Sequence, residues 1–144
     1  MYLYLILPLA AGLVAQISKL FIKSNRREIS FKNISAYSGM PSGHSAIIIS
    51  LAAFAGLKDG LASPLFALSV ILSIIIIRDA LGLRRYIGQH GEFLNDLIKD
   101  LKNDQVLERK YPHLLEKIGH TPAQIIVGGL IGFLISWLGY TFLA

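Results

Sequence analysis

Three long apolar stretches without Asp, Glu, Lys or Arg limit what this chain can fold into. They cover residues 1–18, 60–77 and 121–144. Each is close to the ~20 residues that an α-helix needs to cross the hydrocarbon core of a bilayer. Because hydrocarbon offers no partners to backbone N–H and C=O groups, such stretches form helices there. The sequence therefore predicts an all-α membrane protein.

A fourth apolar stretch, from Pro41 to Leu57, is shorter and opens with the polar residues "PSGHS". We expect a helix whose first turn lies near membrane depth inside the protein. The predicted fold is a polytopic membrane helical bundle with four transmembrane helices, formed by residues 1–144 as a single domain. A cleavable signal peptide at residues 1–18 is disfavoured, because no basic segment precedes the apolar run.

Residues 91–119 show a different pattern. In "GEFLNDLIKDLKNDQVLERKY", five apolar side chains recur at helical spacing among acids and bases: Phe93, Leu94, Leu97, Ile98 and Leu101. This pattern predicts an amphipathic interfacial helix that lies against the membrane surface rather than crossing it. Two roles stay open for it, a solvated linker without chemistry and a gate for substrate.

Composition and charge indicate the class of partner. Hydrophobic residues make up 53% of the chain, there is no cysteine, and the formal net charge is +5. A disulfide framework or a thiolate site is therefore excluded. Basic residues in a membrane protein more often reflect topology and anionic lipid than nucleic acid. We expect membrane lipids and no nucleic acid as partners, and a homo-oligomer is left open.

The basic residues are distributed unevenly about the predicted spans. Four spans in series place both termini on one side of the membrane, and of the 14 Lys and Arg residues only Lys58 lies on that side. The positive-inside rule puts the opposite, basic face in the cytoplasm. We expect an integral protein of the plasma (inner) membrane whose active face is cytoplasmic.

Polar side chains gather at the ends of the spans on this basic side. They are Lys19, Lys23, Arg26, Arg27, Ser42, His44, Ser45, Arg78, Asp79, Arg84, Arg85 and His120. Taken singly, flanking cations usually extend to lipid head groups. Two histidines and several cations at one depth together indicate a functional site.

This combination suits a phosphate ester. Lys and Arg pair with phosphoryl oxygens, and the first turn of a helix adds N–H donors and a favourable dipole. In "PSGH", Pro41 is preset for a helix start and Gly43 allows a ligand to approach the backbone. One histidine can attack phosphorus while the other protonates the departing alcohol, since unperturbed histidines titrate near neutrality.

At these residues the sequence resembles the type 2 phosphatidic acid phosphatase superfamily, which also contains the vanadium haloperoxidases. That family has three signatures: Lys, six residues and Arg-Pro; the block "PSGH"; and Arg, five residues, His, three residues and Asp. The second signature is intact at residues 41–44. The first is partly present, with Lys19 and Arg26 at the family's spacing but Arg27 in place of proline.

The third signature departs most from the family. His120 begins a stretch that resembles the family's last helix, but Gln124 stands in place of the aspartate and Leu114 in place of the arginine. The blocks "RDALGLRR", "GQHGEFLND" and "GHTPAQ" resemble a short, divergent branch of the superfamily. The resemblance covers nearly the whole chain.

The resemblance implies a role for each of these residues. His120 would be the nucleophile that forms a phosphohistidine, and His44 the general acid. The residues that would hold the phosphate are Lys19, Arg26, Ser42, the amide of Gly43, and Arg84 or Arg85 in place of the missing arginine.

Two residues are candidates to support the nucleophile. Gln124 would orient the His120 ring by a hydrogen bond, but an amide cannot stabilise the imidazolium as a carboxylate does. Asp79 is the candidate for that charge, and its alternative is an ion pair with a neighbouring arginine. We expect His90 and His113 to be surface residues. No metal or other cofactor is needed by this mechanism.

The resulting expectation is a metal-independent lipid phosphate phosphatase that hydrolyses a phosphomonoester. Phosphatidylglycerophosphate, phosphatidate and polyprenyl phosphates are all candidate substrates. The alternative is a membrane protein without catalysis that binds anionic lipid or a partner through its basic cytoplasmic face. Haloperoxidase chemistry ranks third, because vanadate would need the full set of cations.

Overall fold

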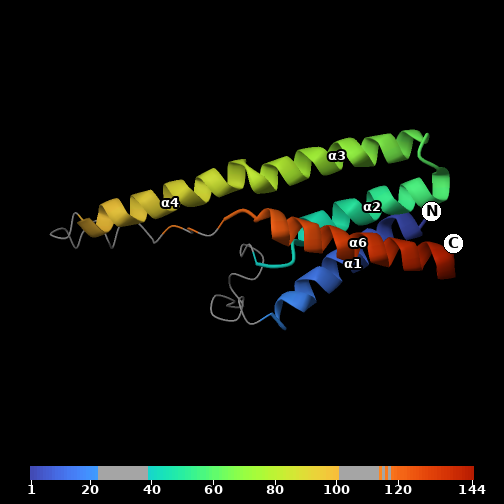
Figure 1. Ribbon diagram of the computed structural model, residues 1–144, viewed down its shortest axis with the longest axis horizontal. Helices are drawn as coiled ribbons and strands as arrows, with labels where there is room; N and C mark the ends of the chain where they lie inside the picture. The colour runs from blue at the N-terminus through green and yellow to red at the C-terminus, as the bar shows by residue number, and fades with distance from the viewer. Residues whose placement is uncertain (23–38, 101–113, 115, 117) are drawn as a thin grey trace.

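A computed structural model describes residues 1–22, 39–100, 114, 116 and 118–144. Its helices are α1 (Leu3–Lys19), α2 (Gly43–Asp59), α3 (Pro64–Leu81), α4 (Leu83–Asp100) and α6 (Pro122–Leu143), shown in Figure 1. Throughout the described part of the chain the regular structure is helical, and no strand occurs there. The expected all-α fold is confirmed.

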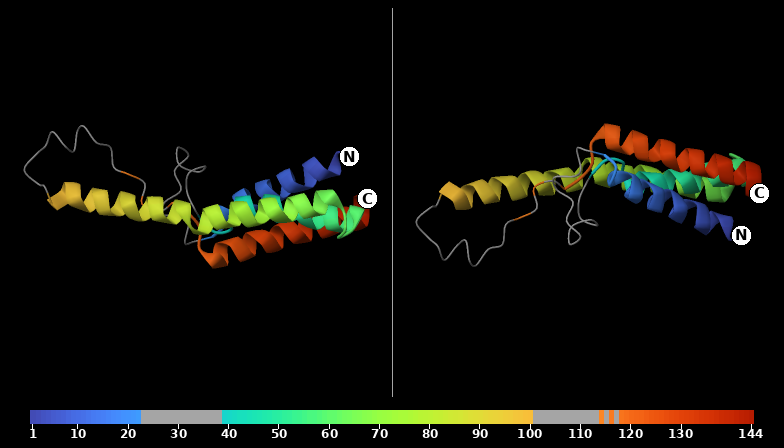
Figure 2. Two further views of the ribbon diagram at one scale, coloured as in Figure 1. Left: turned by 90° about the horizontal axis from the view of Figure 1, so that it is seen from above. Right: turned by 90° about the horizontal axis from the view of Figure 1, so that it is seen from below.

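Helices α1, α2, α3 and α6 form a bundle around α2. The central helix α2 contacts each of the other three, and α1 also contacts α6. Both termini lie at one end of this bundle (Figures 1 and 2). The end of α1, the start of α2, the end of α3 and the start of α6 therefore meet at the opposite end.

Short polar residues begin three of these helices. The Ser42 side chain accepts the N–H of Ser45 at the start of α2, and Ser63 does the same for Phe66 at the start of α3. Thr121 and Gln124 form a reciprocal capping box at the start of α6. Each device satisfies N–H groups that a helix leaves unpaired in its first turn.

Glycines let α6 pack directly on the backbone of α2. A Cβ on Gly128 would lie 2.2 Å from the carbonyl oxygen of Ser42, and one on Gly132 would lie 2.2 Å from that of Ala46. One turn further along, the hydroxyls of Ser50 and Ser136 are 2.7 Å apart and buried. Small residues and paired hydroxyls of this kind hold helices together where surrounding lipid supplies no hydrophobic drive.

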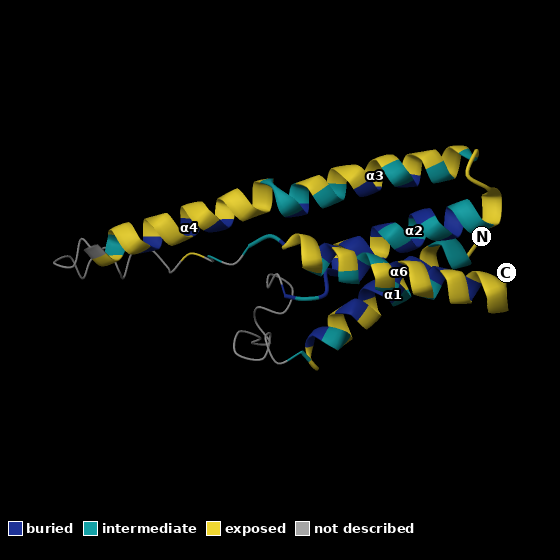
Figure 3. Ribbon diagram, viewed as in Figure 1, coloured by how far each residue is buried: buried dark blue, intermediate teal, exposed yellow. Residues whose placement is uncertain are grey.

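The outward surfaces of the bundle are apolar. Figure 3 shows exposed residues along the outer faces of α1, α3 and α6, and many of them are Leu, Ile or Phe. By length and composition, two helical stretches can cross a membrane: the continuous stretch formed by α3 and α4, and helix α6. Helix α1 is also apolar but shorter. These apolar helices suit a bilayer as solvent.

Helix α4 differs from the expected amphipathic helix in start and direction. It begins at Leu83 rather than Gly91, and it continues the line of α3 past the end of the bundle (Figures 1 and 2). The Gly82 N–H donates to the Arg78 carbonyl at 2.9 Å, and Tyr86 donates to the Gly82 carbonyl at 3.1 Å. Because these bonds carry the helical turn across Gly82, the chain does not fold back along a membrane surface. Leu101, one of the five apolar residues of the expected amphipathic helix, lies outside the described residues.

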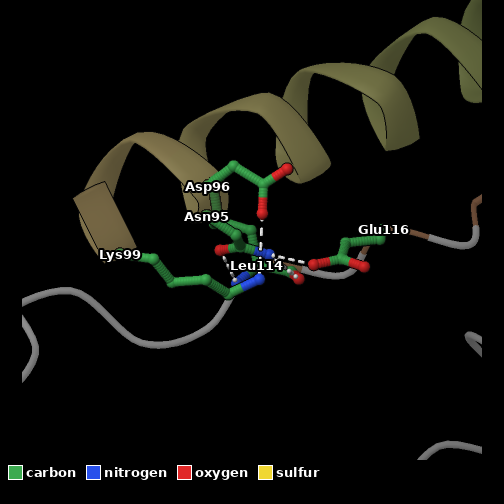
Figure 4. A network of polar contacts seen from close by, with 5 residues as sticks. All are labelled: Asn95, Asp96, Lys99, Leu114 and Glu116. Carbon is green, nitrogen blue, oxygen red and sulfur yellow. Dashed lines mark hydrogen bonds and ion pairs between the residues drawn. The ribbon is translucent and has the colours of Figure 1, made fainter.

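One side of α4 is covered by the segment that returns to α6. The Asn95 side chain donates to the Leu114 carbonyl and accepts the Leu114 N–H, at 2.9 and 3.0 Å, and it also donates to the Glu116 carboxylate (Figure 4). A Cβ on Gly88 would lie 2.3 Å from the Glu116 carbonyl oxygen. These contacts fix the path that leads to His120.

Candidate active site

His120 lies directly before α6, and its backbone is tied to the end of α3. Its N–H donates to the carbonyl of Ala80 at 3.0 Å. Gly119, with φ of 98°, makes the turn that this contact needs, and a Cβ there would meet the backbone nitrogen of Arg85 at 2.8 Å. The His120 side chain is buried, so its position is set by the ends of three helices.

The His120 ring contacts the side chain of Gln124. Gln124 Oε1 lies 3.1 Å from His120 Nδ1, and the same oxygen accepts the N–H of Thr121 at 3.0 Å. Because a backbone N–H only donates, the amide oxygen rather than the amide nitrogen faces the ring. Nδ1 therefore carries the proton, and the lone pair of Nε2 is left unprotonated.

Burial lowers the pKa of His120 below its ordinary value of 6.5. The hydrogen bond with Gln124 raises the pKa in opposition, and the positive charges of Lys19 and Arg84 lower it further. These surroundings favour the neutral ring of His120, the form in which an imidazole can act as a nucleophile or a base.

His44 lies in the first turn of α2, facing the His120 ring. The two ring centroids are 6.3 Å apart and the ring planes are inclined by 58°. The two helix starts are joined by a backbone hydrogen bond from the Ser42 N–H to the Gln124 carbonyl, at 3.0 Å. His44 is exposed whereas His120 is 7% exposed. Only His44 can readily exchange protons with water.

Two cations accompany the histidines. Lys19, the last residue of α1, is 4% exposed, and Arg84 lies in the first turn of α4. Both positive charges act on both imidazole rings. Arg84 Nε donates to Asp79 Oδ2 at 2.7 Å. The site thus combines two histidines with two cations and the N-termini of α2 and α6, a set that fits a phosphate monoester.

The other residues predicted for the site lie in different surroundings. The structure places Asp79 in the ion pair with Arg84, the alternative that the sequence left open. Arg85 is exposed at the start of α4, and Leu114 lies beside Asn95 rather than among the histidines. His90 is exposed.

Four residues named from the sequence cannot be placed, because they lie outside the described residues: Lys23, Arg26, Arg27 and His113. Within the described ranges, no group of three or more His, Asp, Glu or Cys side chains could hold a metal ion.

Sequence reasoning missed two supports of the site. One is the Ala80 carbonyl, which has no signal in the sequence because it acts through the main chain. The other is Gly128 with Gly132, which brings α6 against the start of α2. Their spacing of four in an apolar segment is a known signal for close helix packing, and it was readable in "IIVGGLIG".

The arrangement defines a class of all-helical proteins with long apolar helices and with paired histidines at two helix starts. The chain belongs to the Divergent PAP2 family, whose sequence model matches residues 2–135. The uncharacterized membrane protein YuiD of Bacillus subtilis (strain 168) is 34% identical over 152 residues, which cover 96% of this chain and 95% of that protein. No solved structure gives a significant match.

Proposed function

We propose that the protein is a lipid phosphate phosphatase that works through a phosphohistidine on His120. The observation that carries this proposal is the pair of imidazole rings 6.3 Å apart at two abutting helix starts. In-line transfer needs the nucleophile about 3–3.5 Å from phosphorus and the acid about 2.6–3.2 Å from the leaving oxygen. The rings are close enough for both to reach one bound phosphate ester, His120 at phosphorus and His44 at the leaving oxygen.

The phosphate is held by charge and by helix N-termini. Lys19 and Arg84 neutralise the phosphoryl oxygens, and the first turn of α2 at Ser42 and Gly43 offers backbone donors and a favourable dipole. Arg84 does the work of the arginine of the third family signature, whose position in this chain is occupied by Leu114. Asp79 holds the Arg84 side chain by Nε and so leaves its terminal nitrogens to the substrate.

The reaction has two steps. Nε2 of His120 attacks phosphorus, the P–O bond to the lipid alcohol breaks, and the leaving oxygen takes a proton from His44. A water then attacks the phosphohistidine, with His44 as its base, and inorganic phosphate leaves. Gln124 keeps the Nδ1 proton in place throughout, which fixes the nucleophilic nitrogen.

Membrane placement completes the proposal. We infer that α1, α2, α3 and α6 all cross the plasma membrane, with the histidine end in the cytoplasm. Lys19, Arg78 and Arg84 lie at that end, and Lys58 at the other, as the positive-inside rule requires. The substrate is a lipid whose phosphate reaches head-group depth in the cytoplasmic leaflet, such as phosphatidylglycerophosphate, phosphatidate or a polyprenyl phosphate.

The test is phosphate release from a panel of lipid phosphates in detergent micelles with EDTA present. His44→Ala should lower the rate by roughly 10²–10⁴-fold, as the loss of a general acid does. His120→Ala should abolish release and also the acid-labile phosphoenzyme trapped from labelled substrate. Gln89→Ala is the control, since Gln89 is an exposed polar residue on α4.

Each outcome decides between the two readings of the site. A large loss in His44→Ala and a complete loss in His120→Ala, with Gln89→Ala unchanged, support the phosphatase. Folded wild-type protein that binds lipid phosphates without releasing phosphate supports the non-catalytic lipid-binding protein instead.

A further inference from the structure

Helix α4 carries a broad apolar face that the described part of the protein leaves uncovered. This α4 face consists of Leu83, Tyr86, Ile87, Phe93, Leu94 and Leu97. Their exposed fractions run from 43% for Leu94 to 68% for Phe93, and Figure 3 shows α4 exposed along its length. Apolar patches of this kind mark a binding surface.

The spacing on the α4 face is that of a helix partner. Leu83, Ile87, His90, Leu94 and Leu97 follow one another at alternating steps of four and three. This gives a period of 3.5 residues, at which two helices wind around each other and keep one seam in contact.

The charges on the rest of α4 do not favour a membrane surface as the occupant. Its exposed polar residues include both signs, with Arg85 and Lys99 against Glu92 and Asp96. Helices that lie on anionic lipid are rich in Lys and Arg instead. A second copy of α4 carries the same mixture of charges, so charge does not oppose its binding to this face.

The direction of α4 also favours a second copy of this chain as the partner. Helix α4 continues α3 past the bundle (Figures 1 and 2), and with 18 residues it is about 27 Å long. Where α3 crosses a bilayer, α4 therefore leads into water, which does not cover apolar side chains. Two molecules of this chain in one membrane extend their α4 helices in the same direction. Their α4 faces can therefore meet only with the two helices parallel.

The opposite side of α4 is already filled. Gly88 and Asn95 contact Glu116 and Leu114 of the returning segment, so one face remains for a partner. At roughly 100 Å² of exposed surface for each of six side chains, two such faces would bury about 1,200 Å², which reaches the size of a specific interface.

We propose that two copies of this chain pair through their α4 faces as a parallel coiled coil, so that the protein is a homodimer in the membrane. Each seam residue then lies against the same residue of the other copy. His90 lies in the middle of the seam, where a polar residue fixes register at a cost in stability. The proposal does not depend on the phosphatase activity.

Single cysteines test the pairing directly, because the chain has none of its own. Ile87→Cys and Leu94→Cys should each form a disulfide-linked dimer on mild oxidation in native membranes. Glu92→Cys, on the opposite side of α4, is the matched control and should remain monomeric. No dimer from Leu94→Cys, or equal dimer from Glu92→Cys, would overturn the proposal.

Two seam variants should shift the dimer in opposite directions. In detergent, Leu94→Lys should raise the dimer dissociation constant at least about tenfold, and Gln89→Lys on the polar side should leave it unchanged. His90→Leu should lower it, because an apolar seam residue replaces a polar one. A tighter dimer from a seam change cannot result from misfolding.

The other occupants of the face give distinct results. If lipid covers it, Leu94→Cys stays monomeric and an environment-sensitive dye on that cysteine reports an apolar surrounding that is lost in lipid-free micelles. If another segment of the same chain covers it, the cysteine resists maleimide at every protein dilution. Either result contradicts the dimer.

Discussion

At the scale of single residues, the amide of Gln124 distinguishes this site from one built around a carboxylate. An amide oxygen accepts the Nδ1 proton of His120 and fixes the tautomer, but it adds no negative charge to balance an imidazolium. A cation on His120, as the proposed phosphoryl transfer would form, is therefore less stabilised than it would be beside an aspartate. The Gln124 position controls how readily His120 takes up a proton.

The pH dependence of the proposed reaction should follow the protonation of His120. Because the pKa of His120 lies below 6.5, its neutral form persists as pH falls, and the acid limb of kcat/KM should lie below pH 6.5. Gln124→Glu keeps the capping box and adds a carboxylate, which raises the pKa of His120. The acid limb in pH-rate profiles should therefore move to higher pH, and an unmoved limb would show that His120 does not set it.

Arg84 and Arg85 give a second prediction at this scale. Arg84→Ala should lower kcat by about 10²–10³-fold, as the loss of one transition-state donor does, whereas Arg85→Ala should have little effect. Arg84→Lys should recover only part of the activity, because lysine lacks the planar fork. Similar losses from both alanine variants, measured with the same lipid, would contradict the assignment.

At the scale of helices, the contact between α2 and α6 brings the two histidines together. Capping residues and apolar runs predict where these helices begin, and the starts at Gly43 and Pro122 follow from Ser42 and Thr121. The distance between the helices depends on Gly128 and Gly132 touching backbone atoms, which is a tertiary property. The direction of α4 was also not predictable, since Gly82 is compatible with both a break and a continued helix.

Glycine substitutions test this contact. Gly132→Ala should lower the thermal stability of the purified protein and reduce activity, because its Cβ would lie 2.2 Å from the Ala46 carbonyl oxygen. Gly129→Ala is a matched control on the same helix, since its Cβ would meet Ile49 Cγ1 at an ordinary 3.5 Å. Equal melting temperatures for the two variants would show that α6 does not need this close approach.

At the scale of the whole molecule, the bundle has two chemically different ends. The end with His44 and His120 carries most of the described cations, and the other end carries the Tyr4–Asp59 hydrogen bond and Lys58. Sequence alone predicted this division, because hydropathy gives the spans and their order gives the ends. It left two placements open for Asp79, because the choice depends on where Arg84 lies after the turn at Gly82.

Thiol labelling tests the orientation. With no native cysteine, Ala62→Cys between α2 and α3 should react with an impermeant maleimide in intact cells. Glu92→Cys on α4 should react only after lysis, because the positive-inside rule places it in the cytoplasm. The reverse labelling pattern would place the histidine end outside the cell.

The common position of the two termini also has a practical meaning for anyone who handles this protein. Residues Met1 and Ala144 both lie at the bundle end away from the histidines (Figures 1 and 2). An affinity tag or a fluorescent reporter joined at either position lies at the opposite end of the bundle from His44 and His120. Immobilisation through such a tag leaves the histidine end and α4 free for assay.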